Sequence, residues 1–194
     1  MTTHSNEPDS RRSNAADGTA GSSPEPGGQM LSEDLLNQVL STALGGGAEF
    51  AEVFAEDVER GSVHLDDGRI ESLASGRDRG AGIRVVSGES TGFAHTADLS
   101  ERGLVAAAKA AADAARKTGG GGTRQVALDS SMPTPGAVAV RPGEIDKATK
   151  VGLLQRADEV ARSSGDAISQ VSAGYADSRR RILVANSDGV LSGD

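Results

Sequence analysis

The chain has 194 residues, a length that fits one domain with a tail, and its formal net charge of −8 disfavours a nucleic-acid partner, because phosphate binding needs a cationic face. It has no cysteine, which excludes thiolate metal sites, disulfides and cysteine nucleophiles. No stretch approaches the roughly 20 apolar residues that span a bilayer, and we expect a protein of the cytoplasm with no membrane partner.

The first 29 residues are predicted to form a disordered tail. They are rich in Ser, Gly, Pro, Asn and Thr and hold almost no large apolar side chain, so they cannot bury enough surface to offset the entropy of ordering. Arg11 and Arg12 are followed by polar residues where an export signal needs an apolar segment, and no signal peptide is expected. One domain is predicted over residues 30–194.

An amphipathic helix is predicted to follow the tail. Ser32 can cap its start, leucines recur on one face, and a run of glycines from Gly45 ends it. Alternating segments then predict an antiparallel meander with a two-residue turn at Asp67 and Gly68. Its strands are expected near residues 50–58, 62–66, 69–76, 80–87 and 91–96.

A second helix is predicted over about residues 99–117. Its packing face is almost pure alanine, which permits close approach to a sheet. Glycines end this helix and begin a connector over about 118–143, which contains Gly and Pro and is expected to be flexible. A short strand near residues 125–128 is the one regular element expected within it.

A third helix, over about residues 144–164, carries an apolar stripe that includes Leu153 and Val160. Strands near 167–176 and 180–187 follow it. The elements together predict an α+β fold, in which about three helices pack on an antiparallel or mixed sheet.

Only four side chains are aromatic, and there is no tryptophan. Aromatic residues carry the largest buried area, so a core built from Val, Ile, Leu and Ala stabilises the fold weakly. We therefore expect burial against another domain or subunit. Phe93 is expected in the core because aromatic residues are so few.

No constellation of catalytic or metal-binding residues is found, and none is assigned. The histidines His4, His64 and His95 are not followed by Glu and form no pair at a helical ligand spacing. Neighbouring carboxylates on a strand face opposite sides of the sheet, so we interpret such pairs as solvated charges or turn residues. The pairs are Glu56–Asp57, Asp66–Asp67 and Asp158–Glu159.

The most distinctive string runs from Gly80 to His95 and reads GAGIRVVSGESTGFAH. Its β-branched residues before a turn at Gly88 predict a hairpin. The string resembles the segment GVGVR-x-x-SGE-x-TGFAY in the amino-terminal domain of the TldD type of the TldD/PmbA family, metallopeptidases that are also called modulators of DNA gyrase. His95 stands where that family favours tyrosine, which affects the packing of the hairpin.

Two other segments carry the same resemblance, which covers roughly residues 31–194. Residues 51–56 and 65–70 are similar to the family's ADLYFE and LEDG-x-V segments, and residues 181–191 to its LILVA-x-xDG-x-L segment. The resemblance implies an enzyme that cleaves peptides or unfolded proteins and has zinc as cofactor. In it, a TldD-like subunit holds the metal in a His-Glu-x-x-x-His motif and a PmbA-like subunit lacks it. This chain contains no such motif.

Nine residues match the family's motifs and are expected to be structural or to contact a partner. They are Asp67, Gly68, Gly82, Arg84, Gly88, Glu89, Thr91, Gly92 and Phe93. Asp67 and Gly68 are expected to set the register of their hairpin. Arg84 is interpreted as a cross-strand partner of Glu89, with contact to a peptide carboxylate as the alternative.

The leading hypothesis is an amino-terminal assembly and substrate-guiding domain of a TldD-like zinc metallopeptidase, truncated before the metal site and inactive alone. Its expected partners are a PmbA-like subunit or further copies of the chain, and peptides are the substrates of the complete enzyme. Two alternatives stay open, a stand-alone interaction protein without catalysis and a gene remnant without independent function.

Overall fold

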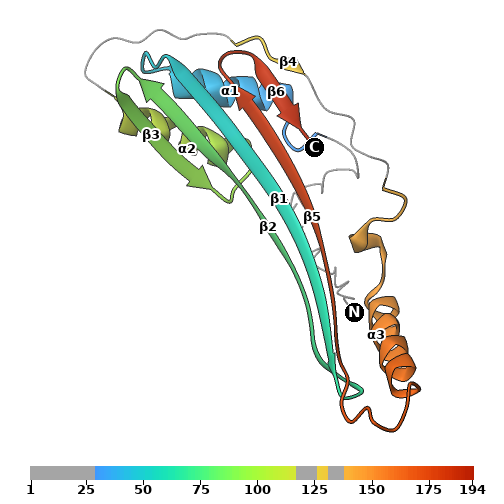
Figure 1. The fold of residues 1–194 in the computed structure, drawn as a ribbon. Coiled ribbons are helices and arrows are strands. Elements are labelled where there is room, and N and C mark those ends of the chain that lie inside the picture. The colour runs from blue at the N-terminus through green and yellow to red at the C-terminus, as the bar shows by residue number, and fades with distance from the viewer. Residues whose placement is uncertain (1–28, 117–125, 131–137) are drawn as a thin grey trace, which may run out of the picture.

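The computed structural model describes residues 29–116, 126–130 and 138–194. Within these residues the chain forms one sheet of six strands in the order β3-β2-β1-β5-β6-β4 (Figure 1). All neighbours are antiparallel except β4 and β6, so the predicted α+β class with a mixed sheet is confirmed. Residues 1–28 of the predicted tail, and residues 117–125 and 131–137 of the predicted connector, lie outside the described residues.

Each α-helix begins at a polar side chain that accepts a hydrogen bond from a backbone N–H of the first turn. The caps are Ser32, Ser100 and Asp146. The helices are α1 (Glu33–Leu44), α2 (Glu101–Ala115) and α3 (Lys147–Arg162), with a 3-10 helix, η1 (Pro142–Glu144), before α3. The third helix begins later than expected because η1 and its cap precede it. In the described part of the chain, none of the helices is long and apolar enough to cross a membrane.

Three of the strands are longer than predicted. The expected breaks near residues 59–61, 77–79 and 177–179 are wrong, because backbone pairing of β1 with β2 and β5 continues through them. Charged side chains occupy both faces there, so apolar alternation disappears while the strands persist. The strands are β1 (Phe50–Asp66), β2 (Arg69–Ser87), β3 (Ser90–Thr96), β4 (Asp129–Ser130), β5 (Ser172–Asn186) and β6 (Val190–Gly193).

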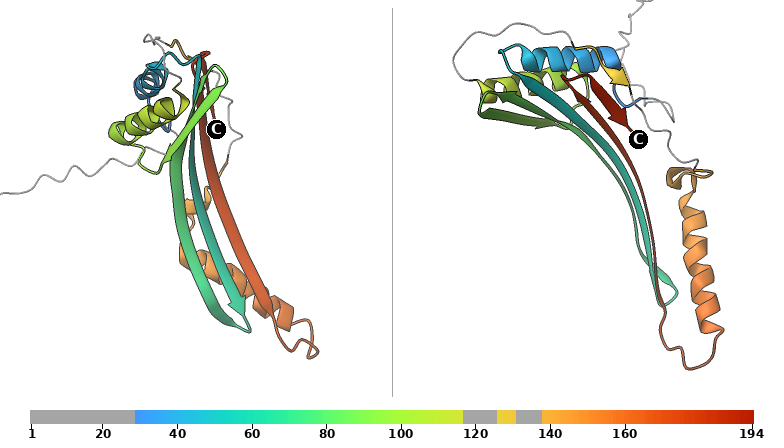
Figure 2. Two further views of the ribbon diagram at one scale, coloured as in Figure 1. Left: turned by 90° about the vertical axis from the view of Figure 1, so that its left-hand side faces the viewer. Right: turned by 45° about the horizontal axis from the view of Figure 1, so that its top comes forward.

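The sheet is curved, and its two faces differ. Odd-numbered residues of β1 share one face, on which Val53 packs in the core of α1 and α2 while Val63 and Leu65 pack against Leu154 of α3. The register places the odd-numbered residues of β5, and those of β2 from Leu73 to Val85, on this same face, which we call the helix face. The even-numbered residues of these strands lie on the other face. Figure 2 shows the helices on the convex side of the sheet, and we call the opposite side the concave face.

The core has two unequal parts. The upper part in Figure 1 lies between α1, α2 and the upper strands and holds most of the buried apolar side chains. In the lower part, beside α3, the buried apolar side chains among the described residues are those of Val63, Leu65 and Leu154. The predicted apolar stripe of α3 is wrong at its large side chains Leu153, which is 55% exposed, and Val160, which is 53% exposed. The side of α3 that carries them does not face the sheet.

Candidate functional site

The turn at Asp67 and Gly68 joins β1 to β2 at the lower end of the sheet. Both residues have positive φ, 47° and 77°, which is the geometry that a two-residue hairpin turn needs and that Asp-Gly readily supplies. The backbone N–H of Asp67 donates to the carbonyl of Val171 at 2.8 Å, which ties the turn to the segment before β5. The predicted turn is therefore confirmed.

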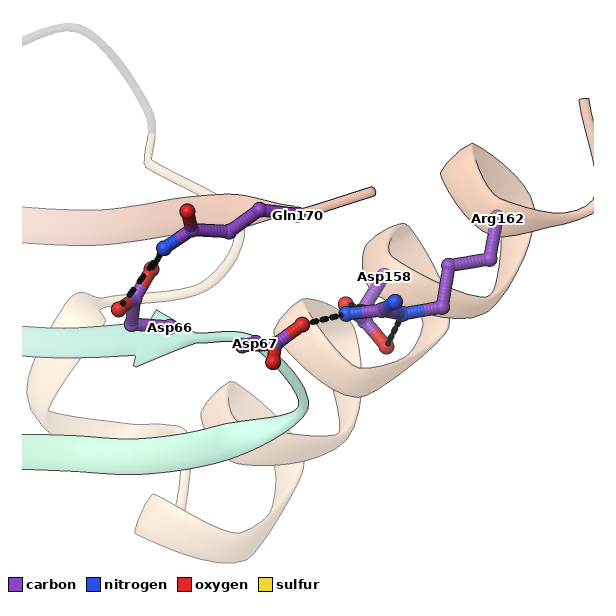
Figure 3. Close-up of polar contacts among 5 residues, drawn as sticks. All are labelled: Asp66, Asp67, Asp158, Arg162 and Gln170. Carbon is purple, nitrogen blue, oxygen red and sulfur yellow. Dashed lines mark hydrogen bonds and ion pairs between the residues drawn. The ribbon is translucent and has the colours of Figure 1, made fainter. Parts of the chain in front are cut away.

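Side chains from three segments meet at this hairpin tip (Figure 3). Arg162, at the end of α3, donates from Nη2 to Asp67 and from Nε to both oxygens of Asp158 at 3.1 Å. Gln170 donates from Nε2 to Asp66 at 3.1 Å. Hydrogen bonds to Asp67 and Asp158 hold the pKa of Arg162 above its ordinary value. The guanidinium of Arg162 bridges the two carboxylates and so anchors the hairpin tip to α3. Because both carboxylates are ion-paired with it, neither is placed to act as a catalytic acid or base.

The motif glycines of β2 and β3 allow close packing. Gly92 faces α2, and a Cβ atom there would lie 1.9 Å from the carbonyl oxygen of Ala111. The ring of Phe93 lies over Gly82, where a Cβ would be 3.1 Å from the ring. Gly88 has a φ of 57° in the β2–β3 turn. These contacts fit the structural role that was expected of the motif. Glu89 lies in the same turn, and Thr91 pairs with Val86.

Three of the four aromatic residues lie on the concave face. Phe50 and Phe54 are even-numbered residues of β1, and Phe93 lies opposite Arg84, which shares their face. The side chain of Phe54 is 37% exposed and that of Phe93 is 62% exposed. With their half-buried neighbours they form what we call the concave patch. Its members are Phe50, Phe54, Phe93, Ile182 and Val184.

Two expectations for the motif residues are wrong. Phe93 is not in the core, because the register turns its side chain toward the face without helices. Arg84 forms its ion pair with Glu52 of β1 at 3.4 Å, since the register places Glu52 and Phe93, not Glu89, beside it. The guanidinium of Arg84 also lies 5.5 Å from the centre of the Phe50 ring, a cation–π contact at the rim of the concave patch.

Two carboxylates that were interpreted as solvated are buried. Asp57 is only 6% exposed, and Arg77 donates to its two oxygens at 2.8 and 2.5 Å. These hydrogen bonds hold the pKa of Asp57 below its ordinary value. Asp158 is also buried and pairs with Arg162. The signal was present in the sequence, because Asp57 continues the alternation of Val53 and Ala55 on the helix face.

A third polar cluster joins α3 to β5 and was not predicted. Lys150 lies 2.7 Å from Asp177 and donates to the carbonyl of Pro142 at 2.9 Å. The ammonium also lies 5.6 Å from the centre of the Tyr175 ring. The hydrogen bond from Lys150 lowers the pKa of Asp177, and a hydrogen bond to Asp177 raises the pKa of Tyr175. The ion pair and the ring contact hold α3 on the sheet.

The described residues do not fit a metal ion. In this part of the chain, no three or more His, Asp or Glu side chains are grouped so that they could hold one. His95 lies opposite Gly82 in the upper part of the sheet, whereas His64 lies opposite Ser72 near the hairpin tip. His4 lies outside the described residues. The described residues supply ion pairs, close packing and an exposed apolar patch.

Comparison with known proteins places the chain in a family. Its residues 51–115 match the PmbA/TldA metallopeptidase domain 1, and residues 140–194 match the PmbA/TldA metallopeptidase central domain. Together the two segments span more than half of the chain. The chain belongs to the PmbA/TldD metallopeptidase family. The resemblance found in the motifs is thereby confirmed.

Relatives within this family are much longer than the chain. A metalloprotease TldD homolog from Haemophilus influenzae is 30% identical over 147 residues, which cover 75% of this chain and 30% of the relative. A metalloprotease TldD homolog from Buchnera aphidicola is 35% identical over 117 residues, which cover 60% of this chain and 24% of the relative. The names of these PmbA/TldD relatives imply that the family uses a metal, without stating which.

Solved structures share the fold. A protein from Thermotoga maritima, named as a candidate modulator of DNA gyrase, matches with a TM-score of 0.67 and 15% identity, over 84% of this chain and 36% of that chain. TldE from Thermococcus kodakarensis matches with a TM-score of 0.62 and 17% identity, over 82% of this chain and 36% of that chain. At these identities the PmbA/TldD structures support the fold alone.

Proposed function

We propose that the chain is the amino-terminal assembly and substrate-guiding part of a TldD-type zinc metallopeptidase, which cleaves peptides or unfolded proteins in the cytoplasm. The proposal assigns the metal and the hydrolytic step to another part of the enzyme, because the described residues offer no metal-binding group. The nine motif residues then have structural or partner-contact roles. Membership in a metallopeptidase family supports the enzyme class.

The observation that carries the proposal is the concave patch. A chain with four aromatic residues places three of them on a sheet face that has no helix among the described residues. Large exposed apolar side chains gathered in one place mark interaction surfaces, and aromatic residues dominate the energetics of such surfaces. We propose a PmbA-like subunit as the partner that covers this patch.

Mixing the purified chain with a PmbA-like subunit tests the assembly role. Gel filtration with light scattering should show a complex, and titration calorimetry should give its Kd. The double variant Phe54→Ser, Phe93→Ser should weaken binding by at least about tenfold, because interfaces concentrate their energy in buried aromatic anchors. Leu153→Ser is the matched control, since Leu153 is also exposed but lies on α3. Unchanged binding by the double variant would show that this patch is not the contact.

The catalytic part of the proposal is tested by zinc content and peptidase activity of the same samples. The chain alone should bind no stoichiometric zinc and cleave no unfolded protein. Zinc-dependent cleavage by the chain alone would contradict the assignment of the chemistry to another part of the enzyme. A metal-binding TldD-type subunit, measured alongside, provides the positive control.

The second candidate function is a stand-alone interaction protein. It is favoured by the upper core, which α1, α2 and their strands complete within the described residues. A chain that binds a partner firmly, yet neither restores nor alters peptidase activity in any mixture of TldD-like and PmbA-like subunits, would support this alternative over the leading proposal.

A further inference from the structure

The middle of the helix face, between the upper part and α3, carries an unusual arrangement of charges. Two carboxylates of β1, Asp57 and Glu59, each lie between two arginines of the neighbouring strands. The register places Arg79 and Arg181 beside Asp57, and Arg77 and Arg179 beside Glu59. We call these four arginines the arginine cluster.

Two of the four arginines in the cluster form no ion pair among the described residues. Arg77 binds Asp57 and lies 3.7 Å from Glu59, so one guanidinium engages both carboxylates. Within the described residues, Arg79 and Arg179 form no ion pair at 4.0 Å or less. The charges of Arg181 and Arg79 add to the hydrogen bond from Arg77 in lowering the pKa of Asp57.

The same stretch of the concave face is balanced, which makes it an internal comparison. There Arg60 pairs with Asp78 at 2.9 Å, and Arg180 pairs with Glu56 at 2.5 Å. Two arginines therefore meet two carboxylates on the concave face, and Val58, which lies between them in the sheet, is buried. In this stretch, arginines without an ion pair among the described residues therefore lie on the helix face alone.

Protection of sheet edges does not account for the placement of Arg79 and Arg179. Within the described residues, β3 pairs with β2 along residues 81–87 and β6 pairs with β5 along residues 183–185, so the cluster lies where β2 and β5 have no further described strand beside them. Charged residues at edges prevent unwanted strand pairing. Charged residues on either face of the sheet prevent such pairing. Edge protection therefore does not explain why Arg79 and Arg179, which form no ion pair among the described residues, both lie on the helix face.

We propose that the arginine cluster binds an acidic polypeptide segment laid across β2, β1 and β5. Guanidinium groups pair with carboxylates in a planar, two-point geometry, and the outer strands hold them about 10 Å apart on either side of β1. Asp57 and Glu59 stand between the arginines and repel a continuous line of phosphates. A polypeptide can instead place its carboxylates over the arginines and neutral groups over β1. The inference concerns binding and does not rest on the proposed peptidase role.

Fluorescence anisotropy with the full chain and a labelled glutamate-rich peptide tests the proposal. The double variant Arg79→Gln, Arg179→Gln should raise the Kd by at least about fivefold, from the loss of two partly exposed charge contacts. The variant Arg79→Lys, Arg179→Lys keeps the charge and should keep most of the affinity. Arg60→Gln, Arg180→Gln is the matched control, because it removes two arginines of the same stretch, one from β1 and one from β5, on the concave face.

Each outcome bears on the inference. Equal weakening by the helix-face and concave-face double variants would show a response to overall charge and would overturn the site. A single-stranded oligonucleotide that binds as tightly as the peptide, with the same dependence on Arg79 and Arg179, would overturn the choice of an acidic polypeptide. Circular dichroism and thermal unfolding check each variant. If the double variant does not fold, the single change Arg79→Glu at an exposed position must weaken binding, or the proposal fails.

Discussion

The upper and lower parts of the sheet use the same three long strands but are held together differently. In the upper part, fully buried residues such as Leu36, Leu40 and Leu104 fill the space between two helices and the sheet. In the lower part, α3 rests on a small apolar cluster and on two sets of ion pairs, centred on Arg162 and Lys150. One continuous sheet thus has an end held by apolar burial and an end held by charge. We expect the lower end to open first and to respond to salt and pH.

The sharpest test of this difference removes one leucine from each part. Leu104→Ala should lower the free energy of unfolding by about 4 kcal/mol, because a fully buried leucine leaves a cavity in the upper core. Leu154→Ala, at the margin of the smaller cluster, should cost about 2 kcal/mol. Urea unfolding measures both changes, and hydrogen exchange should show that Leu154→Ala loosens α3 first. Equal costs would remove the distinction between the two parts.

Gly92→Ala should cost about 3 kcal/mol by overpacking, since the added Cβ would meet the backbone of α2. The thermal unfolding midpoint should fall accordingly. Gly76→Ala provides the control, because a Cβ there would have no neighbour within 4 Å and the change should be nearly neutral. A tolerated Gly92→Ala would contradict the close contact of β3 with α2.

At the hairpin tip, Arg162→Gln should lower the free energy of unfolding more than a change of its exposed partner does, because it leaves the buried Asp158 without its cation. Asp67→Asn should cost less than about 1 kcal/mol, since that carboxylate is largely exposed. Hydrogen exchange in α3 and in residues 170–173 measures the effect. High salt should narrow the gap between wild type and Arg162→Gln, and a salt-independent gap would argue against an ionic anchor.

The smallest of the expected effects concerns the stability that Asp57 contributes, and it is measurable only at acidic pH. The pKa of Asp57 lies below its ordinary value of 3.8, so its carboxylate contributes stability that is complete above that value and is lost as the pH falls through the folded-state pKa. The double variant Asp57→Asn, Arg77→Gln should therefore lose less stability than wild type as the pH falls below 3.8. Urea unfolding at a series of acidic pH values measures the slopes. Parallel slopes would show that Asp57 is not linked to folding.

Features decided by neighbours in sequence were predictable. The cap at Ser32, the turn at Asp67 and Gly68, and the alanine face of α2 each depend on local hydrogen bonds or on the period of a helix. The motif strings indicated the family for the same reason, because they lie within single strands and turns. Features that depend on which face is covered were predicted badly, as Phe93, Asp57 and Leu153 show.

The sequence by itself determined the class of fold, the family and the absence of a His-Glu-x-x-x-His motif, since these follow from composition, local pattern and residue identity. Only the tertiary structure decided that the strands run unbroken, that three aromatic residues face away from the helices, and that four arginines gather on one side. The physical reason is that alternation along a strand defines two faces without stating which one a helix will cover. That choice is made by the packing of α1, α2 and α3, which joins residues far apart in the chain.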